Sequence, residues 1–475
     1  MTVLPDTARL RAHLDRLNQG LLERETAVRL ALLAALAGEH VLLIGPPGTA
    51  KSELARRLHR AFAGARYFER LLTRFSTPEE LFGPLSLQAL EADRYERLVD
   101  GYLPTAGIAF LDEVFKANSA ILNALLTLLN ERQFDNGAQR LAVPLVCVIA
   151  ASNEPPADES LQAFHDRFLL RVPVAPVSDA GFAALLQLSD APAPDAAAAP
   201  PPITEHERTA VRRAAAGVAL GDEALTALAA LRAQAVALAL PVSDRRWRQL
   251  LGLMRCAAAT EGRSTLDAID LWLVPYVVAH DADSVPRLQQ WVDDHLLQLP
   301  PPPAAQDGPL PWLGHAVTAF EKQLEIEQRM PADGEDDAAG KLALARALGG
   351  HDGGDGMQRI VSATLEAKLA RRWSPVHLAA RLAQVDALRQ QVQAARATLQ
   401  AARQALAARL AGRLWLPPGL AAHWLGRHGA HLDALAACAA RLDNTHAGFA
   451  AQPQDDSLPA TPPEPVDLPP APALA

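Results

Sequence analysis

The sequence predicts an α/β fold: a three-layer αβα core, followed by a smaller all-helical unit and an elongated helical bundle. Three continuous apolar runs between amphipathic stretches are typical of strands buried on both faces of a parallel sheet. These runs are Val41–Ile44, Ile108–Leu111 and Leu145–Ala151. From Thr204 to His295 the apolar residues have helical spacing without a convincing strand, and from Pro375 they follow a heptad repeat.

Length and composition indicate a soluble protein with several domains. A chain of 475 residues is too long for one ordinary core. Apolar residues make up 49% and charged residues 21%, as in globular proteins, and the low aromatic content of 5% beside abundant alanine and leucine favours helices. The net charge of −9 offers no broad attraction for nucleic acid or an anionic membrane, so we expect no nucleic-acid partner.

Cysteines and termini point to the cytoplasm. Cys147, Cys256 and Cys438 are scattered in apolar contexts without metal-ligand spacing, which predicts reduced core residues. The segment Met1–Leu14 lacks the pattern of a signal peptide. No apolar run approaches the roughly 18 residues that a membrane span requires.

Proline-rich and glycine-rich stretches divide the chain. The stretch Ser189–Pro202 is rich in proline and alanine and predicts a stiff linker. The last residues are proline-rich and acidic, which favours disorder. We therefore predict seven segments: the αβα core at 1–190, a linker at 191–202, an all-α unit at 203–298, a linker with the first helix of the C-terminal unit at 299–329, an acidic glycine-rich insertion at 330–357, the helical bundle at 358–450 and a disordered tail at 451–475.

One long helix is predicted from Pro375, with Ser374 as its cap. Apolar residues recur every seven positions along it and form a coiled-coil-like seam. An elongated antiparallel bundle is the simplest interpretation, and a seam that binds a partner protein is the alternative. The heptad residues are Leu378, Val385, Val392, Leu399 and Leu406.

A phosphate-binding loop follows the first predicted strand directly and precedes a helical run, which is the context such a loop requires. Its backbone N–H groups and the helix N-terminus can hold phosphates, while Lys51 neutralises the β- and γ-phosphates and Ser52 binds Mg²⁺. Ala50 stands where the common pattern has glycine, and we expect the loop to remain intact because a methyl group is small. The loop residues are Gly45, Pro46, Pro47, Gly48, Thr49, Ala50, Lys51 and Ser52.

Polar residues end the next two buried strands. Asp112 and Glu113 follow Ile108–Leu111 and, because side chains alternate along a strand, they can divide the work. We predict that Asp112 holds Mg²⁺ through water and that Glu113 orients and deprotonates the attacking water. Asn153, after the third strand, suits a sensor between these acids and the γ-phosphate.

Arginines complete the predicted site. In a ring ATPase one arginine must project into the neighbouring subunit's site, and we favour Arg167 over Arg171 and Arg132. A local ion pair is the alternative role for Arg167. In the helical unit, Ser243 caps a helix whose Arg245 is predicted to reach back over the γ-phosphate of its own subunit.

Together these residues resemble the MoxR family of AAA+ ATPases, most closely its RavA subgroup. The similarity extends beyond the general motifs to Thr73–Ser86, Gly101–Pro104 and Asn130–Phe134, and covers about residues 5–295. The resemblance implies an AAA+ αβα P-loop core with an all-α lid subdomain, an ATP and Mg²⁺ site, and a homo-hexamer. It also implies a partner with a von Willebrand factor A domain, such as a ViaA-like protein, and chaperone-like remodelling of protein complexes.

The resemblance weakens in the C-terminal part. Residues 84–104 would hold the helix-2 insertion of this clade, facing a central pore or a partner. RavA proteins interrupt their C-terminal helices with a compact domain that binds a metabolic decarboxylase. Here only about 330–357 lie at that position, so the inserted LARA-like domain looks vestigial and we expect no decarboxylase link.

Two other functions use the same residues. A nucleotide-gated scaffold would assemble a partner complex and hydrolyse ATP slowly. A nucleic-acid motor is less favoured, because no basic and aromatic stripe marks a nucleic-acid module and the charge is unfavourable.

Overall fold

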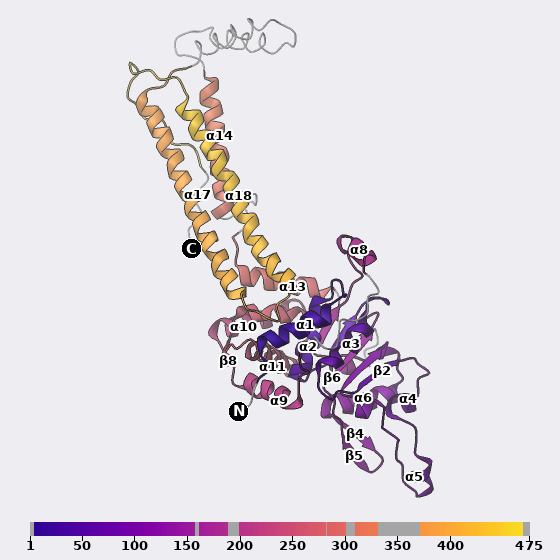
Figure 1. Cartoon of the computed structure of the whole chain (residues 1–475). Coiled ribbons are helices and arrows are strands. Elements are labelled where there is room, and N and C mark those ends of the chain that lie inside the picture. The colour runs from indigo at the N-terminus through magenta and orange to yellow at the C-terminus, as the bar shows by residue number, and fades with distance from the viewer. Residues whose placement is uncertain are drawn as a thin grey trace, which may run out of the picture. The chain divides into compact units, whose positions relative to one another are not determined.

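The computed structural model divides into two units (Figure 1). The first comprises Met1–Leu297 with Gly412–Ala421, and the second comprises Gln298–Ala411 with Ala422–Ala475. The structure describes residues 4–156, 161–188, 199–281, 283–300, 309–330 and 371–468. Most of the predicted 191–202 linker and of the 330–357 insertion lies outside these ranges.

The core contains a five-stranded parallel sheet in the order β2-β3-β6-β1-β7. All strands therefore end at one side, here termed the carboxyl edge, and begin at the opposite side, the amino edge. The strands are β1 (Val41–Ile44), β2 (Tyr67–Leu71), β3 (Ile108–Asp112), β6 (Cys147–Ser152) and β7 (Leu170–Pro173). The three strands predicted from apolar runs are confirmed to within two residues, and they occupy the three central positions of the sheet.

Helices cover this sheet, and a small hairpin extends from it. A cluster of leucine, phenylalanine and valine side chains packs α6 and the segment around α4 against β3 and β6. The core helices are α1 (Thr7–Asn18), α2 (Glu25–Ala37), α3 (Lys51–Leu58), α4 (Pro78–Phe82), α5 (Leu87–Glu91), α6 (Ser119–Glu131), α7 (Gln162–His165) and α8 (Asp179–Leu186). Short 3-10 turns are His59–Ala61, Leu103–Thr105 and Val114–Lys116, and the hairpin strands are β4 (Gln133–Asn136) and β5 (Gln139–Ala142).

The rest of the first unit is a helical lid, as predicted. Ser243 accepts a hydrogen bond from the Arg246 amide and so caps α11, which confirms that helix start. Among its described residues, two strands of two residues each, β8 (Ala219–Leu220) and β9 (Thr265–Leu266), lie between the helices. The lid elements are α9 (Glu205–Ala216), α10 (Asp222–Ala237), α11 (Asp244–Thr260), the 3-10 helix η6 (Ala268–Leu273), α12 (Val274–Val278) and α13 (Ser284–Leu297).

The second unit is an elongated helical bundle of α14 (Pro309–Arg329), α17 (Pro375–Leu410) and α18 (Pro418–Ala450), seen as long coiled ribbons in Figure 1. Ser374 caps α17 by accepting from the His377 amide. The five heptad residues of α17 are all buried. The leading interpretation, an antiparallel bundle, is therefore confirmed, since the bundle itself covers the seam.

The predicted disorder of the 451–475 tail is wrong for its described part. Residues 451–468 lie along the bundle: the Trp373 amide donates to Pro453 O at 2.9 Å, and Arg381 Nη1 donates to Glu464 O at 2.7 Å. Val466 and Leu468 pack against the bundle core. The proline-rich chain adds no helix, but its carbonyls and few apolar side chains find partners. Residues 469–475 lie outside the described residues.

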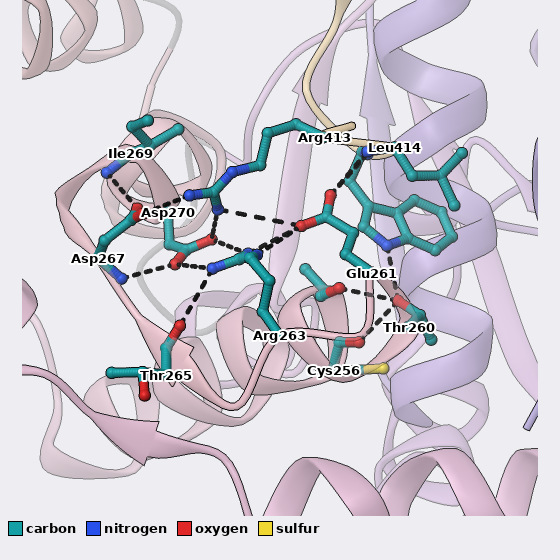
Figure 2. A network of polar contacts seen from close by, with 12 residues as sticks. Cys256, Thr260, Glu261, Arg263, Thr265, Asp267, Ile269, Asp270, Arg413 and Leu414 are labelled. Atoms are coloured by element: carbon teal, nitrogen blue, oxygen red, sulfur yellow. Dashed lines mark hydrogen bonds and ion pairs between the residues drawn. The ribbon is translucent and has the colours of Figure 1, made fainter. Parts of the chain in front are cut away.

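The segment Gly412–Ala421, which holds the turn between α17 and α18 and the first residues of α18, belongs to the first unit (Figure 2). Leu414 and Trp415 are fully buried there. Trp415 Nε1 donates to Thr260 Oγ1 at 2.8 Å, and the Leu414 amide donates to Glu261 Oε1 at 2.8 Å. The end of α11 therefore receives this turn through both apolar burial and hydrogen bonds.

A buried charge network fixes the same turn. Arg413 donates to Asp270 Oδ1 at 3.0 Å and also contacts Asp267 and Glu261. Arg263 donates to the same Asp270 carboxylate at 2.6 Å. Two arginines thus share three carboxylates, and the side chains of Arg413, Asp270 and Glu261 are each at most 7% exposed.

Within the described ranges, none of the helices combines the length and apolarity that a membrane crossing would need.

Candidate nucleotide site

The phosphate-binding loop joins β1 to α3 at the carboxyl edge. Lys51 begins α3, is 8% exposed, and donates from Nζ to Gly45 O at 2.6 Å and to Pro46 O at 2.8 Å. A Cβ at Gly45 would lie 2.0 Å from Val174 O, so only glycine fits there. The lysine amine therefore lies within the loop and bonds its carbonyl oxygens. Phosphate oxygens of a bound nucleotide could replace the Gly45 and Pro46 carbonyls as its partners.

The alanine in the loop adopts the conformation that glycine normally supplies. Ala50 has φ of +64° and Gly48 has φ of +78°. A left-handed conformation costs an L-residue roughly 1–2 kcal/mol. The expected intact loop is present, and its strain is localised at Ala50. The first turn of α3, with Ser52 in it, follows directly and offers unpaired N–H groups.

The two predicted carboxylates lie at the end of β3. Glu113 has a left-handed φ of +53°, which turns the chain sharply after Asp112, and its amide donates to Asp112 Oδ1 at 3.0 Å. Strain of this kind is frequent at functional sites. Burial lowers the pKa of Lys51, and the negative charges of Asp112 and Glu113 oppose that shift. The amine and the two carboxylates therefore form one electrostatic group.

Asn153 contacts the second carboxylate. Its Nδ2 donates to Glu113 Oε1 at 2.6 Å, and Lys116 Nζ lies 3.3 Å from Glu113 Oε2. The contact follows from the sheet order, because β6 is the neighbour of β3 and both end at the carboxyl edge. Two donors fix the Glu113 carboxylate, one on each oxygen. The sequence did not indicate Lys116.

The sequence also gave no sign of a second loop support, Arg24. Its side chain donates from Nε to Thr49 O at 3.0 Å and from Nη2 to Ala175 O at 2.7 Å. Arg24 is 7% exposed, and burial lowers its pKa. The neighbouring Glu23 accepts from the Ser178 amide at 2.8 Å. An arginine before a helix looks like an ordinary solvated residue, so no local pattern distinguishes it.

Two of the three finger candidates are held inside their own subunit. Arg132 donates from Nη2 to Gly38 O at 2.7 Å and also binds Leu145 O. Arg171 is 3% exposed and donates to Ala279 O at 3.0 Å. Both side chains join structural segments, so neither is available to project outward.

Arg167 differs from these two. It follows α7, just before β7 begins, and its guanidinium has no hydrogen bond or ion pair with any residue that the structure describes; its Nε is buried without a partner. A buried donor without an acceptor is uncommon and calls for an explanation. Arg167 is thus the one candidate whose side chain is not already engaged among the described residues.

Arg245 is not where the sequence predicted it. Its Nη2 donates to Asn130 Oδ1 at 3.1 Å, and Asn130 lies two residues before Arg132. Arg132 in turn donates to the carbonyls of Gly38 and Leu145, which precede β1 and β6. Arg245 therefore lies at the amino edge. The four residues of β1 alone separate the two edges by about 13 Å. It does not reach the phosphate loop of its own chain, and the predicted contact is corrected.

The residue beside it explains the error. Arg246 is 1% exposed and donates to Val277 O at 2.7 Å and to Phe168 O at 2.8 Å. This arginine joins the start of α11 to α12 and to the segment just before β7. Consecutive helix residues point about 100° apart, so burying Arg246 directs Arg245 along the amino edge.

The residues at the carboxyl edge fit a magnesium nucleotide. The loop provides backbone N–H groups, a helix N-terminus and the Lys51 amine for phosphates. Mg²⁺ in such sites takes only one or two protein oxygens besides phosphate and water. The Ser52 hydroxyl as a direct ligand, with the Asp112 carboxylate acting through water, would satisfy that requirement without a larger ligand cluster.

Comparisons with known proteins agree with this geometry. Residues 8–206 match the family described as "MoxR domain in the MoxR-vWA-beta-propeller ternary systems", and residues 223–292 match an AAA lid domain. Two uncharacterized proteins of Methanocaldococcus jannaschii are 38% and 39% identical over 57% of this chain, covering 71% and 70% of their own lengths. Protein MoxR of Paracoccus denitrificans is 30% identical over 35% of this chain and 50% of its own.

Proposed function

Because the chain belongs to the MoxR family of AAA+ ATPases, we propose that it binds ATP with Mg²⁺ at the carboxyl edge and hydrolyses it. The observation that carries this proposal is the contact between Asn153 and Glu113 beside the Lys51 loop. These groups come from three separate strand ends, and a chance arrangement would not give each a role in phosphoryl transfer.

Each residue would have a distinct task. Lys51 would leave the Gly45 and Pro46 carbonyls and neutralise the β- and γ-phosphates. Bound Mg²⁺, held by Ser52 and through water by Asp112, would supply further charge neutralisation. Glu113 would accept the proton of the attacking water, while Asn153 keeps its carboxylate aligned. Lys116 would compete for the same carboxylate when no nucleotide is bound.

The arginines support a ring. Arg167 and Arg245 both lie toward the amino edge, whereas the phosphate loop lies at the carboxyl edge. We propose that Arg167 enters the site of an adjacent subunit, as a transition-state finger, in a homo-hexamer. Any nucleotide contact of Arg245 would then also be to a neighbour's ATP, not its own.

The insertion at 84–104 offers a surface for other proteins. Within or beside it, several large apolar side chains are exposed, among them Phe75, Leu87, Tyr95 and Leu98. Exposed apolar side chains in one region mark interaction surfaces. We propose a RavA-like, chaperone-like remodeller in the cytoplasm that uses this surface on a client, with a von Willebrand factor A-domain protein as partner and a β-propeller protein as further candidate.

ATPase assays with the purified full chain test the proposal. Lys51→Gln should abolish nucleotide binding, whereas Glu113→Gln should bind ATP and not turn it over. Partner-stimulated hydrolysis that client remodelling requires would support the motor. Full remodelling by Glu113→Gln would instead favour the slow assembly scaffold, and salt-dependent binding of the assembled protein to DNA would favour a nucleic-acid motor.

A further inference from the structure

A cavity of about 620 Å³ opens at the amino edge of the sheet. Its wall includes Arg66, Gly107 and Val146, which directly precede β2, β3 and β6, and the other side is formed by α9 and the end of β5. This volume is in the range of small-molecule sites. The phosphate loop lies at the opposite edge, so this cavity is separate from the ATP site of the same chain.

The cavity wall carries an excess of positive charge. Arg66, Arg132, Arg208 and Arg212 line it, against the single carboxylate of Glu205. Arg66 pairs with Asp100 at 2.5 Å, and the donors of Arg132 are directed at backbone carbonyls. Two of the four guanidinium groups are therefore already engaged.

Within the described residues, the guanidinium groups of Arg208 and Arg212 are not engaged in this way. Arg208 and Arg212 lie four residues apart on α9, so they share one face of the helix. Neither guanidinium makes an ion pair or hydrogen bond with any residue in the described part of the chain. Burial lowers the pKa of Arg208, and repulsion from Arg212 and Arg132 lowers it further, while Glu205 opposes the shift. The positive charges are thus close enough to repel one another.

We propose that this cavity binds an oligophosphate, either as a free anion or as the phosphate end of a small ligand. The guanidinium forks of Arg208 and Arg212 match phosphate oxygens and would exchange mutual repulsion for charge-assisted hydrogen bonds. None of the described residues that line the cavity is aromatic, so a base would gain no stacking partner from them. Recognition therefore rests on the phosphates.

Calorimetry with the full chain carrying Lys51→Gln tests this proposal, because that change removes the lysine of the ATP site. The probes are tripolyphosphate, ATP and poly-glutamate, with sulfate at matched ionic strength. The test variant adds Arg208→Gln and Arg212→Gln. The matched control adds Arg213→Gln instead, an exposed arginine of α9 without a described side-chain partner.

Tripolyphosphate should bind the Lys51→Gln chain and the Arg213→Gln control equally, and at least about tenfold more weakly to the double arginine variant. Equal affinity of ATP would identify the phosphates alone as the ligand, and tighter ATP binding would identify a phosphate-bearing nucleotide. Unchanged affinity in the double variant would overturn the proposal, as would an equal response to sulfate. Binding of poly-glutamate without tripolyphosphate would assign the cavity to an acidic peptide. Circular dichroism checks that each variant is folded.

Discussion

Replacing Arg413 tests whether the turn between α17 and α18 is fastened by charge. Arg413→Met keeps the apolar stem and removes the guanidinium that joins Asp270, Asp267 and Glu261. Arg263 alone would then neutralise Glu261 and Asp270, and Asp267 would lose its contact with Arg413. Because Asp270 is 2% exposed and Glu261 4% exposed, water cannot replace the lost partner.

The expected loss is large. Removing one partner of a buried charge pair costs about 3–5 kcal/mol, and the low exposure of this network places it in that class. The loss should also depend on pH. Burial already raises the pKa of Glu261, and Arg413 opposes that shift, so the variant should raise the pKa further. A raised carboxyl pKa in the folded state gives stability at low pH that is lost as pH rises, so the defect should be greater at pH 8 than at pH 5.

Urea unfolding followed by tryptophan fluorescence measures this, since Trp415 is fully buried in the same turn. Arg403→Met is the matched control: Arg403 is exposed on α17 and has no described side-chain partner. Because the chain has two units, the first unit's transition is the relevant one. If Arg413→Met matched Arg403→Met within about 0.5 kcal/mol at pH 8, the network would not fasten the turn.

Three further changes probe the site. Arg167→Ala should leave ATP binding intact and lower turnover on the order of 10³-fold. Arg171→Ala should instead mainly lower the free energy of unfolding, by about 2–4 kcal/mol. Steady-state ATPase assays and urea unfolding separate the two effects, and normal turnover in Arg167→Ala would reject its role as the finger. Ala50→Gly should keep the ATP affinity and the melting temperature of the wild type, whereas Ala50→Val should lower both, because a branched side chain disfavours φ of +64°. The same ATP affinity and melting temperature in both variants would show that the backbone at Ala50 is not strained. Burial raises the pKa of Glu39 to about 7, although the positive charges of Arg132 and Arg245 oppose that shift. As pH rises from 4.5 to 7, the free energy of unfolding of the wild type should therefore fall by up to about 3 kcal/mol relative to that of Glu39→Gln. Parallel curves of stability against pH for the two proteins would contradict the shift.

The strands that could be predicted from the sequence are those buried on both faces of the sheet. Val41–Ile44 and Cys147–Ser152 are apolar on both faces because they lie inside the sheet, and a continuous apolar run identifies such strands. Tyr67–Leu71 is the edge strand β2 and is largely exposed. Its charged residues interrupt any apolar run, so the sequence pattern did not predict this strand. Leu170–Pro173 contains Arg171, which is buried through long-range carbonyl contacts that no local pattern shows.

The same limit explains the site residues. Lys51, Asp112 and Glu113 are predictable because phosphate chemistry requires these residue types at fixed positions around strand ends. Arg24 and Arg245 depend on which distant carbonyl or amide lies nearby, across gaps of 25 and 115 residues to Thr49 and Asn130. Spacing along the chain carries no information on such contacts. A long charged side chain reveals its partner only when the tertiary structure is known.

The sheet itself separates the two halves of the proposed reaction. Lys51 and Glu113 lie at the carboxyl edge, and Arg245 lies at the amino edge, at least a strand length of about 13 Å away. A side chain cannot bridge that distance through a packed core, and bending the sheet would break its hydrogen bonds. An arginine from the amino edge can therefore serve a nucleotide only by meeting the carboxyl edge of another copy. Isolated subunits should accordingly bind ATP and hydrolyse it poorly, and the turnover per subunit should rise as assembly proceeds.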